Sequence, residues 1–434
     1  MHKTINKGLL EAYKASISSF IGTTLEFYDF LLFGFLAPVF GPLFFPSSNY
    51  ITSILYVYAA FAVGFAFRPL GAIFFGQLGD KKIGRKNVLF ITIILMGVVS
   101  IGMGIAPTYG EVGITAAVIM VVLRVLQGFA LGGEYGGGVT LTSELAPNNR
   151  RGFFVGITQL SQSSLLPAGL LAVFTSIFTH SQFVAYGWRI LFIIGAIIAV
   201  VGVYIRISLT ESPDFKEAIK SIAEKKKIAI AEAVSEFPYK IILGILLILG
   251  GTVGSYFFGT FGVTYLEVFL HYSLHAASTA VAYGSIMFLI MVMPTAILSD
   301  KIGRKPNMII MRVGILVFIG IFLYMLSLTN FFIIVLAFVI AFAITAFNQA
   351  AVNTTIPELF PGRVRLTSTS FIYNFGVGLF GGLTPFIATA ILGQFHTGYA
   401  LALWVVPATA ISLIAVLLLK ETKNIDMHDE SSYL

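Results

Sequence analysis

Apolar residues gather along this chain into long segments separated by short polar turns. A helix that crosses a bilayer needs about 20 mostly apolar residues, and twelve segments reach that length. The predicted spans are roughly 17–40, 52–78, 87–106, 112–142, 153–179, 188–208, 241–269, 277–298, 307–328, 331–356, 367–393 and 399–419. A charged stretch divides them into two sets of six. The pattern therefore predicts an all-α membrane protein with six-helix bundles at 1–208 and 241–434, joined by a cytoplasmic linker at 209–240.

Lysine and arginine are distributed unevenly between the turns. They precede the first span and follow every even-numbered span. The turns after spans 1, 3, 7, 9 and 11 contain neither residue, and the turn after span 5 brings only Arg189. Because cytoplasmic loops carry the excess of positive residues, we expect both termini to be cytoplasmic in a multi-pass protein of the plasma membrane.

Composition excludes several classes of protein. The chain is 57% hydrophobic and 11% charged, with a mean hydropathy of +0.92, whereas a soluble domain carries about 25% charged residues. Cysteine is absent, which excludes disulfides and thiolate chemistry. The net charge of +7 resides mainly in loops that set membrane orientation, so we expect no nucleic-acid partner. No Walker A motif, metal cluster or nucleophile–base set is visible, so we predict no enzyme activity, no metal and no cofactor.

Two motifs occur once in each half. Gly76-Gln-Leu-Gly-Asp80-Lys-Lys-Ile-Gly-Arg85-Lys86 after span 2 is matched by Leu298-Ser-Asp300-Lys-Ile-Gly-Arg304-Lys305 after span 8. Ser143-Glu-Leu-Ala-Pro147 after span 4 is echoed by Pro357-Glu-Leu-Phe-Pro361 after span 10. Parallel repeats of this kind form two bundles with a substrate site between them near the midplane. A receptor with duplicated helices is the alternative.

The first of these motifs resembles the hallmark turn of the major facilitator superfamily, G-x-x-x-D-[RK]-x-G-R-[RK]. The second copy fits this pattern, and the first has one extra lysine between Asp80 and Gly84. Within the superfamily the chain is similar to the metabolite:proton symporters. The segments that carry this resemblance are Gly22–Phe30, Arg68–Gly71, Arg124–Gly137, Gly187–Arg189, Glu211–Phe215 and Gly381–Phe386. The resemblance implies the two-bundle fold and a cargo of carboxylates or of zwitterions such as proline and betaine, and we expect a monomer.

Five charged residues lie well inside apolar segments of the N-terminal half: Glu26, Asp29, Arg68, Arg124 and Glu134. Each central charge costs about 2.5–3.5 kcal/mol, so five unpaired charges would cost on the order of 10 kcal/mol. They must therefore face one another or a wet cavity. Structural salt bridges are the alternative role for Arg124 and Glu134, and Asp29 could serve only as a structural partner of Arg68.

The carboxylates among these five are candidate proton carriers. Glu26 and Asp29 are three residues apart and share a helix face. Burial and mutual repulsion favour protonation of one of them, so we expect Glu26, Asp29 and Glu134 to supply the proton coupling.

The remaining candidates concern substrate binding. Arg124, with or without Arg68, suits a carboxylate because a guanidinium binds both oxygens. The neutral candidates for hydrogen bonds to substrate are Tyr28, Gln127, Asn348 and Tyr373. Gln159 and Gln162 could line the cavity or only join helices, and we expect Gly128, Gly132 and Gly136 to serve helix packing.

These residues suggest a hypothesis of proton-coupled symport of a small organic acid or zwitterion by alternating access. A proton and a substrate enter from outside, their charges offset those of the site, and the halves rock to release both inside. The alternatives are a sugar facilitator of the same superfamily and a non-transporting sensor.

The resemblance also implies a cytoplasmic gate at the two charged turns. Asp80 would meet the N-terminus of span 11 near Leu366–Ser370, and Asp300 would meet that of span 5 near Gly152. Helix N-termini favour an aspartate by about 0.3–1 kcal/mol. Arg85 and Arg304 would steady their own turns.

Overall fold

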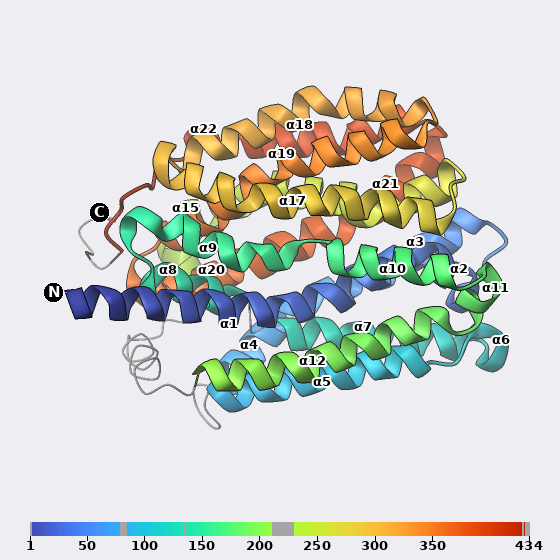
Figure 1. Ribbon diagram of the computed structural model, residues 1–434, viewed down its shortest axis with the longest axis horizontal. Coiled ribbons are helices and arrows are strands. Elements are labelled where there is room, and N and C mark those ends of the chain that lie inside the picture. Colours follow the sequence, from blue (N-terminus) through green and yellow to red (C-terminus); the bar gives the residue numbers. More distant parts are fainter. Residues whose placement is uncertain (1, 79–84, 133–134, 211–229, 428, 430–434) are drawn as a thin grey trace.

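The computed structural model describes residues 2–78, 85–132, 135–210, 230–427 and 429 (Figure 1). These residues form helices and connecting turns, with no β-strand among them. The helices of the first half are α1 (His2–Phe35), α2 (Ala37–Phe44), α3 (Tyr50–Ala66), α4 (Arg68–Leu78), α5 (Arg85–Ile105), α6 (Tyr109–Val112), α7 (Ile114–Leu131), α8 (Tyr135–Leu145), η2 (Asn148–Arg150), α9 (Arg151–Gln159), η3 (Leu160–Gln162), α10 (Leu165–Ile177), α11 (His180–Gln182), η4 (Phe183–Gly187) and α12 (Trp188–Thr210).

The second half repeats this arrangement. Its helices are α14 (Ile230–Glu236), α15 (Pro238–Tyr256), η5 (Phe257–Phe261), α16 (Gly262–Thr264), η6 (Tyr265–Phe269), α17 (Leu274–Ile302), α18 (Arg304–Ser327), α19 (Phe331–Glu358), α20 (Gly362–Gly376), η7 (Val377–Gly381), α21 (Gly382–Phe395), η8 (Gly398–Leu401) and α22 (Ala402–Leu418).

The predicted spans correspond to these helices. Ten helical runs of the described residues are long and apolar enough to cross a membrane, and α1 with α2 adds an eleventh as a bent pair. The remaining predicted span, the third, appears as the shorter apolar helix Ile91–Ile105. One boundary differs clearly from the prediction. The first helix begins at His2 rather than near residue 17, because the polar N-terminal residues continue the same helix beyond the apolar segment.

Several spans are bent, and local sequence explains the bends. α1 and α2 meet at 65°, where Pro38 occupies the first turn of α2. Proline has no N–H and blocks a continuous helix. Span 5 breaks at Ser163, whose extended backbone separates η3 from α10. The Ser163 hydroxyl accepts a bond from Leu165 N at 3.2 Å. The break places the polar end of η3 in the middle of the molecule.

Glycines allow spans 2 and 4 to touch through their backbones. A Cβ atom at Gly128 would lie 1.7 Å from the carbonyl oxygen of Gly64, and one at Gly132 would lie 1.9 Å from that of Arg68. Both substitutions are sterically excluded unless the helices separate. The packing role expected for these two glycines is therefore present, and it fixes Arg124 and Arg68 on neighbouring helices.

The two halves lie side by side along the long axis of the molecule (Figure 1). Helices α17, α18, α19 and α22 occupy one side, and α5, α7 and α12 occupy the other. The halves contact each other mainly through α17 with α9 and α10, and through α3 with α21. The described residues nearest to the two termini lie at the same end of the molecule, which we call the termini end (Figure 1).

Candidate functional site

A small cavity lies between the two halves near the middle of the molecule. The N-terminal half contributes Phe27 and Gln162 to its wall. The other lining residues come from three spans of the C-terminal half: Ile248, Gly251, Thr252, Ser255, Tyr256, Asn348, Gln349, Val352, Asn353, Tyr373 and Val377. Its volume of about 30 Å³ exceeds the roughly 10–15 Å³ that a single water molecule needs. The site is therefore contracted around space for a few water molecules.

Hydrogen bonds between amides join the halves beside this cavity. Gln162 Nε2 donates to Gln159 Oε1 at 2.7 Å, and Asn353 Nδ2 donates to the same oxygen at 3.0 Å across the interface. Gln162 Nε2 also lies 3.5 Å from the Tyr373 hydroxyl. Of the two alternatives left open by the sequence, Gln162 lines the cavity, whereas Gln159 joins its helix to α19 of the other half.

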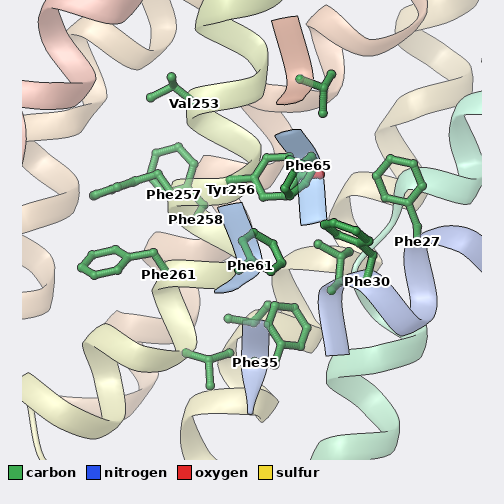
Figure 2. Packing of buried hydrophobic residues seen from close by; sticks show 14 of the residues in the cluster. Phe27, Phe30, Phe35, Phe61, Phe65, Val253, Tyr256, Phe257, Phe258 and Phe261 are labelled. Carbon is green, nitrogen blue, oxygen red and sulfur yellow. The ribbon is translucent and has the colours of Figure 1, made fainter. Parts of the chain in front are cut away.

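Aromatic rings separate the predicted arginines from the cavity. The guanidinium carbon of Arg124 lies 4.2 Å from the ring centre of Phe30, 4.0 Å from that of Phe33 and 5.1 Å from that of Phe61. Its Nη1 donates to Gln127 Oε1. Arg68 similarly lies over Phe30. Phe30 packs against Phe61, whose ring centre lies 6.2 Å from that of Tyr256 of α15, so these rings lie at the junction of the halves (Figure 2). Neither arginine lines the closed cavity.

The carboxylates of α1 are buried in the N-terminal half. Asp29 is 3% exposed, and its Oδ1 has no hydrogen-bond partner. A Cβ atom at Gly195 of α12 would lie only 2.1 Å from that oxygen. Asp29 therefore faces α12 within its own half. Glu26 is 4% exposed and has one oxygen, Oε2, without a hydrogen bond.

The predicted role of Tyr28 is not supported by its position. Its hydroxyl donates to the carbonyl oxygen of Leu191 in α12 at 2.8 Å, so it bonds within the N-terminal half. Asn348 and Tyr373 do line the cavity. Asp80 and Glu134 fall outside the described residues, and Arg85 begins α5 without a described side chain.

An ionic network closes the termini end. Arg151 of α9 pairs with Glu358 of α19 at 2.7 Å, and Arg365 of α20 pairs with Glu144 of α8 at 2.7 Å. Arg304 adds a second contact to Glu358 at 3.3 Å. All of these side chains are buried, and the first two pairs each join one half to the other.

Asp300 makes the contact expected from the resemblance. Its two carboxylate oxygens accept hydrogen bonds from the backbone N–H groups of Gly152 and Phe153, both at 2.8 Å. Arg304 Nη1 donates to Asp300 Oδ1 at 2.7 Å and so steadies its own turn. These groups lie at the N-terminus of α9, where free N–H groups favour a negative charge.

The C-terminal segment also belongs to this network, although no motif in its sequence predicts such a role. Thr422 donates to Glu358 Oε2 at 2.6 Å, and the carbonyl oxygen of Met427 accepts from Arg365 at 2.7 Å. A repeated spacing in the sequence could have pointed to these four residues. In each half a glutamate precedes an arginine by seven residues, as Glu144 precedes Arg151 and Glu358 precedes Arg365. Each glutamate pairs with the arginine of the other half.

The opposite end of the molecule is closed by neutral contacts. Tyr58 of α3 and Thr264 of α16 share a hydrogen bond of 2.6 Å between their hydroxyls. His275 Nδ1 lies 2.9 Å from the carbonyl oxygen of Ala172. Since both ends are closed, the structure represents an occluded state of the cavity.

One buried charge of the C-terminal half was missed. Arg312 of α18 is fully buried and bonds to Asn348 at 3.0 Å. Arg312 meets the criterion that selected the five residues of the N-terminal half, because it is a charged residue inside an apolar segment. It lies five residues after the predicted start of its span, near the end where a charged side chain can reach the interface.

Comparison with known proteins agrees with this architecture. Residues 19–383 match the family model of the Major Facilitator Superfamily. A glycine betaine/proline/ectoine/pipecolic acid transporter of Dickeya dadantii is 30% identical over 425 residues, which cover 95% of this chain and 84% of that protein. An inner membrane metabolite transport protein of Escherichia coli is 30% identical over 420 residues, covering 95% and 94%.

A solved structure shares the fold at low identity. The crystal structure of a D-xylose-proton symporter superposes with a TM-score of 0.74 at 18% identity, covering 95% of this chain and 99% of the other. The all-helical architecture, the paired halves and the family match agree. The chain therefore belongs to the Major Facilitator Superfamily, and it is a multi-pass membrane transporter rather than an enzyme.

Proposed function

We propose that this protein imports a small zwitterionic metabolite together with a proton, across the cell membrane and by alternating access. The observation that carries the proposal is a closed, neutral cavity between the halves with buried ionisable groups behind its N-terminal wall. Intramembrane ionisable residues mark substrate and proton pathways. The lysine-rich turns support a cytoplasmic location for the termini end, because cytoplasmic loops carry the excess of positive residues.

The chemistry of the cavity favours a zwitterion over a dicarboxylate. Its described wall contains no charged side chain, and it presents the rings of Phe27, Tyr256 and Tyr373 with the amides of Asn348 and Gln349. Aromatic faces attract ammonium groups, quaternary ones in particular. Amide N–H groups can bind a carboxylate. Two relatives whose names include proline and betaine fit this chemistry.

Proton coupling is assigned to the N-terminal half. Asp29 is the preferred carrier because it combines a buried oxygen without a hydrogen bond, which Glu26 also has, with an electrostatic interaction with Arg124. Glu26 and Glu134 remain the other candidates. Protonation removes the charge that opposes closure of an apolar site. Substrate release then requires the ionic network at the termini end to open.

Uptake by proteoliposomes tests this function. The panel contains glycine betaine, L-proline, citrate and D-glucose, each measured with and without an acidic exterior. We expect uptake of at least one zwitterion, stimulated by the gradient. Uptake of glucose alone would favour the sugar facilitator, and saturable binding without any flux would favour a sensor.

Gly195→Ala tests the position of Asp29. The added methyl group would lie 2.1 Å from Asp29 Oδ1, so the carboxylate must move while the helix is retained. Leaving a preferred rotamer costs about 0.5–1.5 kcal/mol, so we expect gradient-driven uptake to fall up to about tenfold. Gly97→Ala on α5 is the matched control, because a Cβ atom there meets nothing within 4 Å. Equal uptake by both variants would contradict this placement.

A further inference from the structure

Arg312 is a buried cation held by neutral groups. Its Nε donates to Ser412 Oγ at 2.9 Å, its Nη1 to Met308 O at 2.9 Å and Asn348 Oδ1 at 3.0 Å, and its Nη2 to Leu247 O at 2.6 Å. Its side chain forms no ion pair with a carboxylate among the described residues. The positive charge of the guanidinium therefore lies inside the C-terminal half. The side chain of Asn348, which bonds to Arg312, connects it to the cavity wall.

This arginine fixes the orientation of the Asn348 amide. A guanidinium offers only donors, so the amide atom that faces Arg312 must be the oxygen. The NH2 group of Asn348 then points the other way, towards Gly251 of α15. A Cβ atom at Gly251 would lie 2.0 Å from Asn348 Nδ2, which shows how closely the amide approaches that helix. Asn348 and Gly251 both line the cavity.

We propose that Arg312 is a positioning residue that makes Asn348 the binding group for the carboxylate of the substrate. Arg312 holds the oxygen of the amide, so only donors face the cavity. Its uncompensated charge also makes this wall attractive to an anion, since charges interact strongly where water is excluded. The inference rests on the proposed zwitterion function. It assigns binding of the substrate carboxylate to the C-terminal half. Arg124 then takes part in proton coupling and does not bind the substrate.

A purely structural role for Arg312 predicts a different outcome. Its bonds join α15, α18, α19 and α22, so its loss would weaken packing for every ligand alike. The positioning role predicts a loss that depends on the carboxylate. Glycine betaine and choline form a matched pair of probes, because they share the trimethylammonium group and differ in the carboxylate.

The experiment measures the apparent Kd of both probes from the thermal stabilisation of purified protein. Wild type should bind glycine betaine more tightly than choline. In Arg312→Gln the affinity for glycine betaine should fall about tenfold to a hundredfold, the range for a hydrogen bond to a charged group. The affinity for choline should change less than about threefold. Arg312→Lys should restore part of the preference for the carboxylate.

Two further variants make the test specific. Ser412→Ala removes another partner of Arg312 but leaves Asn348 in place, so the preference should persist. Asn348→Asp keeps Arg312 paired while replacing the donor with oxygens that only accept, so it should abolish the preference. Asn348→Asp decides the question if Arg312→Gln does not fold.

The outcomes separate the two proposals. If wild type binds glycine betaine but Arg312→Gln and Asn348→Asp retain the preference for the carboxylate, the role of Arg312 is overturned and the proposed function stands. If wild type binds neither glycine betaine nor L-proline, the zwitterion function fails and this inference fails with it.

Glycine substitutions on α15 test the same contact from the opposite side. Gly251→Ala should displace the Asn348 amide and reduce binding of glycine betaine by about tenfold or more, comparable to losing its hydrogen bond. Gly254→Ala is the control, because a Cβ atom there meets its nearest neighbours at 3.6 Å, an ordinary contact. Equal binding by the two variants would contradict the geometry.

Discussion

Glu358→Gln is expected to open the termini end of the transporter. Glu358 is fully buried and contacts Arg151, Arg304 and Thr422. Removing one partner of a buried ion pair costs about 3–5 kcal/mol, because the remaining charge stays buried and unpaired. Of these contacts, the ion pair with Arg151 joins the two halves, and opening of the termini end would have to break it. The substitution should therefore shift the equilibrium towards the open state by roughly a hundredfold or more.

Spin-label distances measure this shift. The chain has no cysteine, so cysteines introduced at Asn149 and Lys301 provide the only labelling sites. Both positions are exposed and lie on opposite halves at the termini end. We expect a short distance in the wild type and a longer one in Glu358→Gln, together with slower uptake.

An exposed ion pair provides the control for Glu358. Arg363 and Glu236 pair at the surface, with side chains 39% and 37% exposed. Exposed pairs contribute about 0–1 kcal/mol, so Glu236→Gln should leave the distances unchanged. A wild-type distance distribution in Glu358→Gln would contradict the role of the network as a gate.

Asp29→Asn is expected to abolish accumulation driven by protons while leaving exchange intact. The amide of the introduced asparagine cannot carry a transported proton. The asparagine nevertheless fills nearly the same space as Asp29 beside Gly195. A gradient of ~1 pH unit stores about 1.4 kcal/mol per proton, enough for roughly tenfold accumulation. The wild type should approach this ratio under such a gradient. The variant should only equilibrate the substrate.

Counterflow separates coupling from binding. Exchange of labelled for unlabelled substrate requires no net proton movement, so Asp29→Asn should retain it. Glu26→Gln is the companion variant and should keep accumulation. If Glu26→Gln loses accumulation and Asp29→Asn keeps it, the proton carrier lies three residues earlier on the same face of α1.

The length of the apolar segments was sufficient to predict the helices, because a bilayer requires long apolar segments with all backbone groups bonded internally. The internal repeat predicted the pairing of the halves, and the family pattern predicted the Asp300 contact with Gly152. These features depend on segment length and local motif, both of which can be read along a single chain.

The arrangement inside the cavity could not be predicted in the same way. Side chains on one span face several neighbours, and only packing decides which neighbour each one meets. Tyr28 bonds to Leu191 in its own half, and aromatic rings separate Arg124 from the cavity. Arg312 gains its importance through Asn348, which is 36 residues away on another helix.

Proton movement that accompanies substrate entry tests proton-coupled symport most directly. Proteoliposomes containing a trapped pH-sensitive dye are held without an initial pH gradient, and glycine betaine or L-proline is added outside. Proton-coupled symport predicts acidification of the interior when a transported zwitterion is added to wild-type vesicles, and none with Asp29→Asn. Substrate uptake by the wild type without acidification would contradict proton coupling.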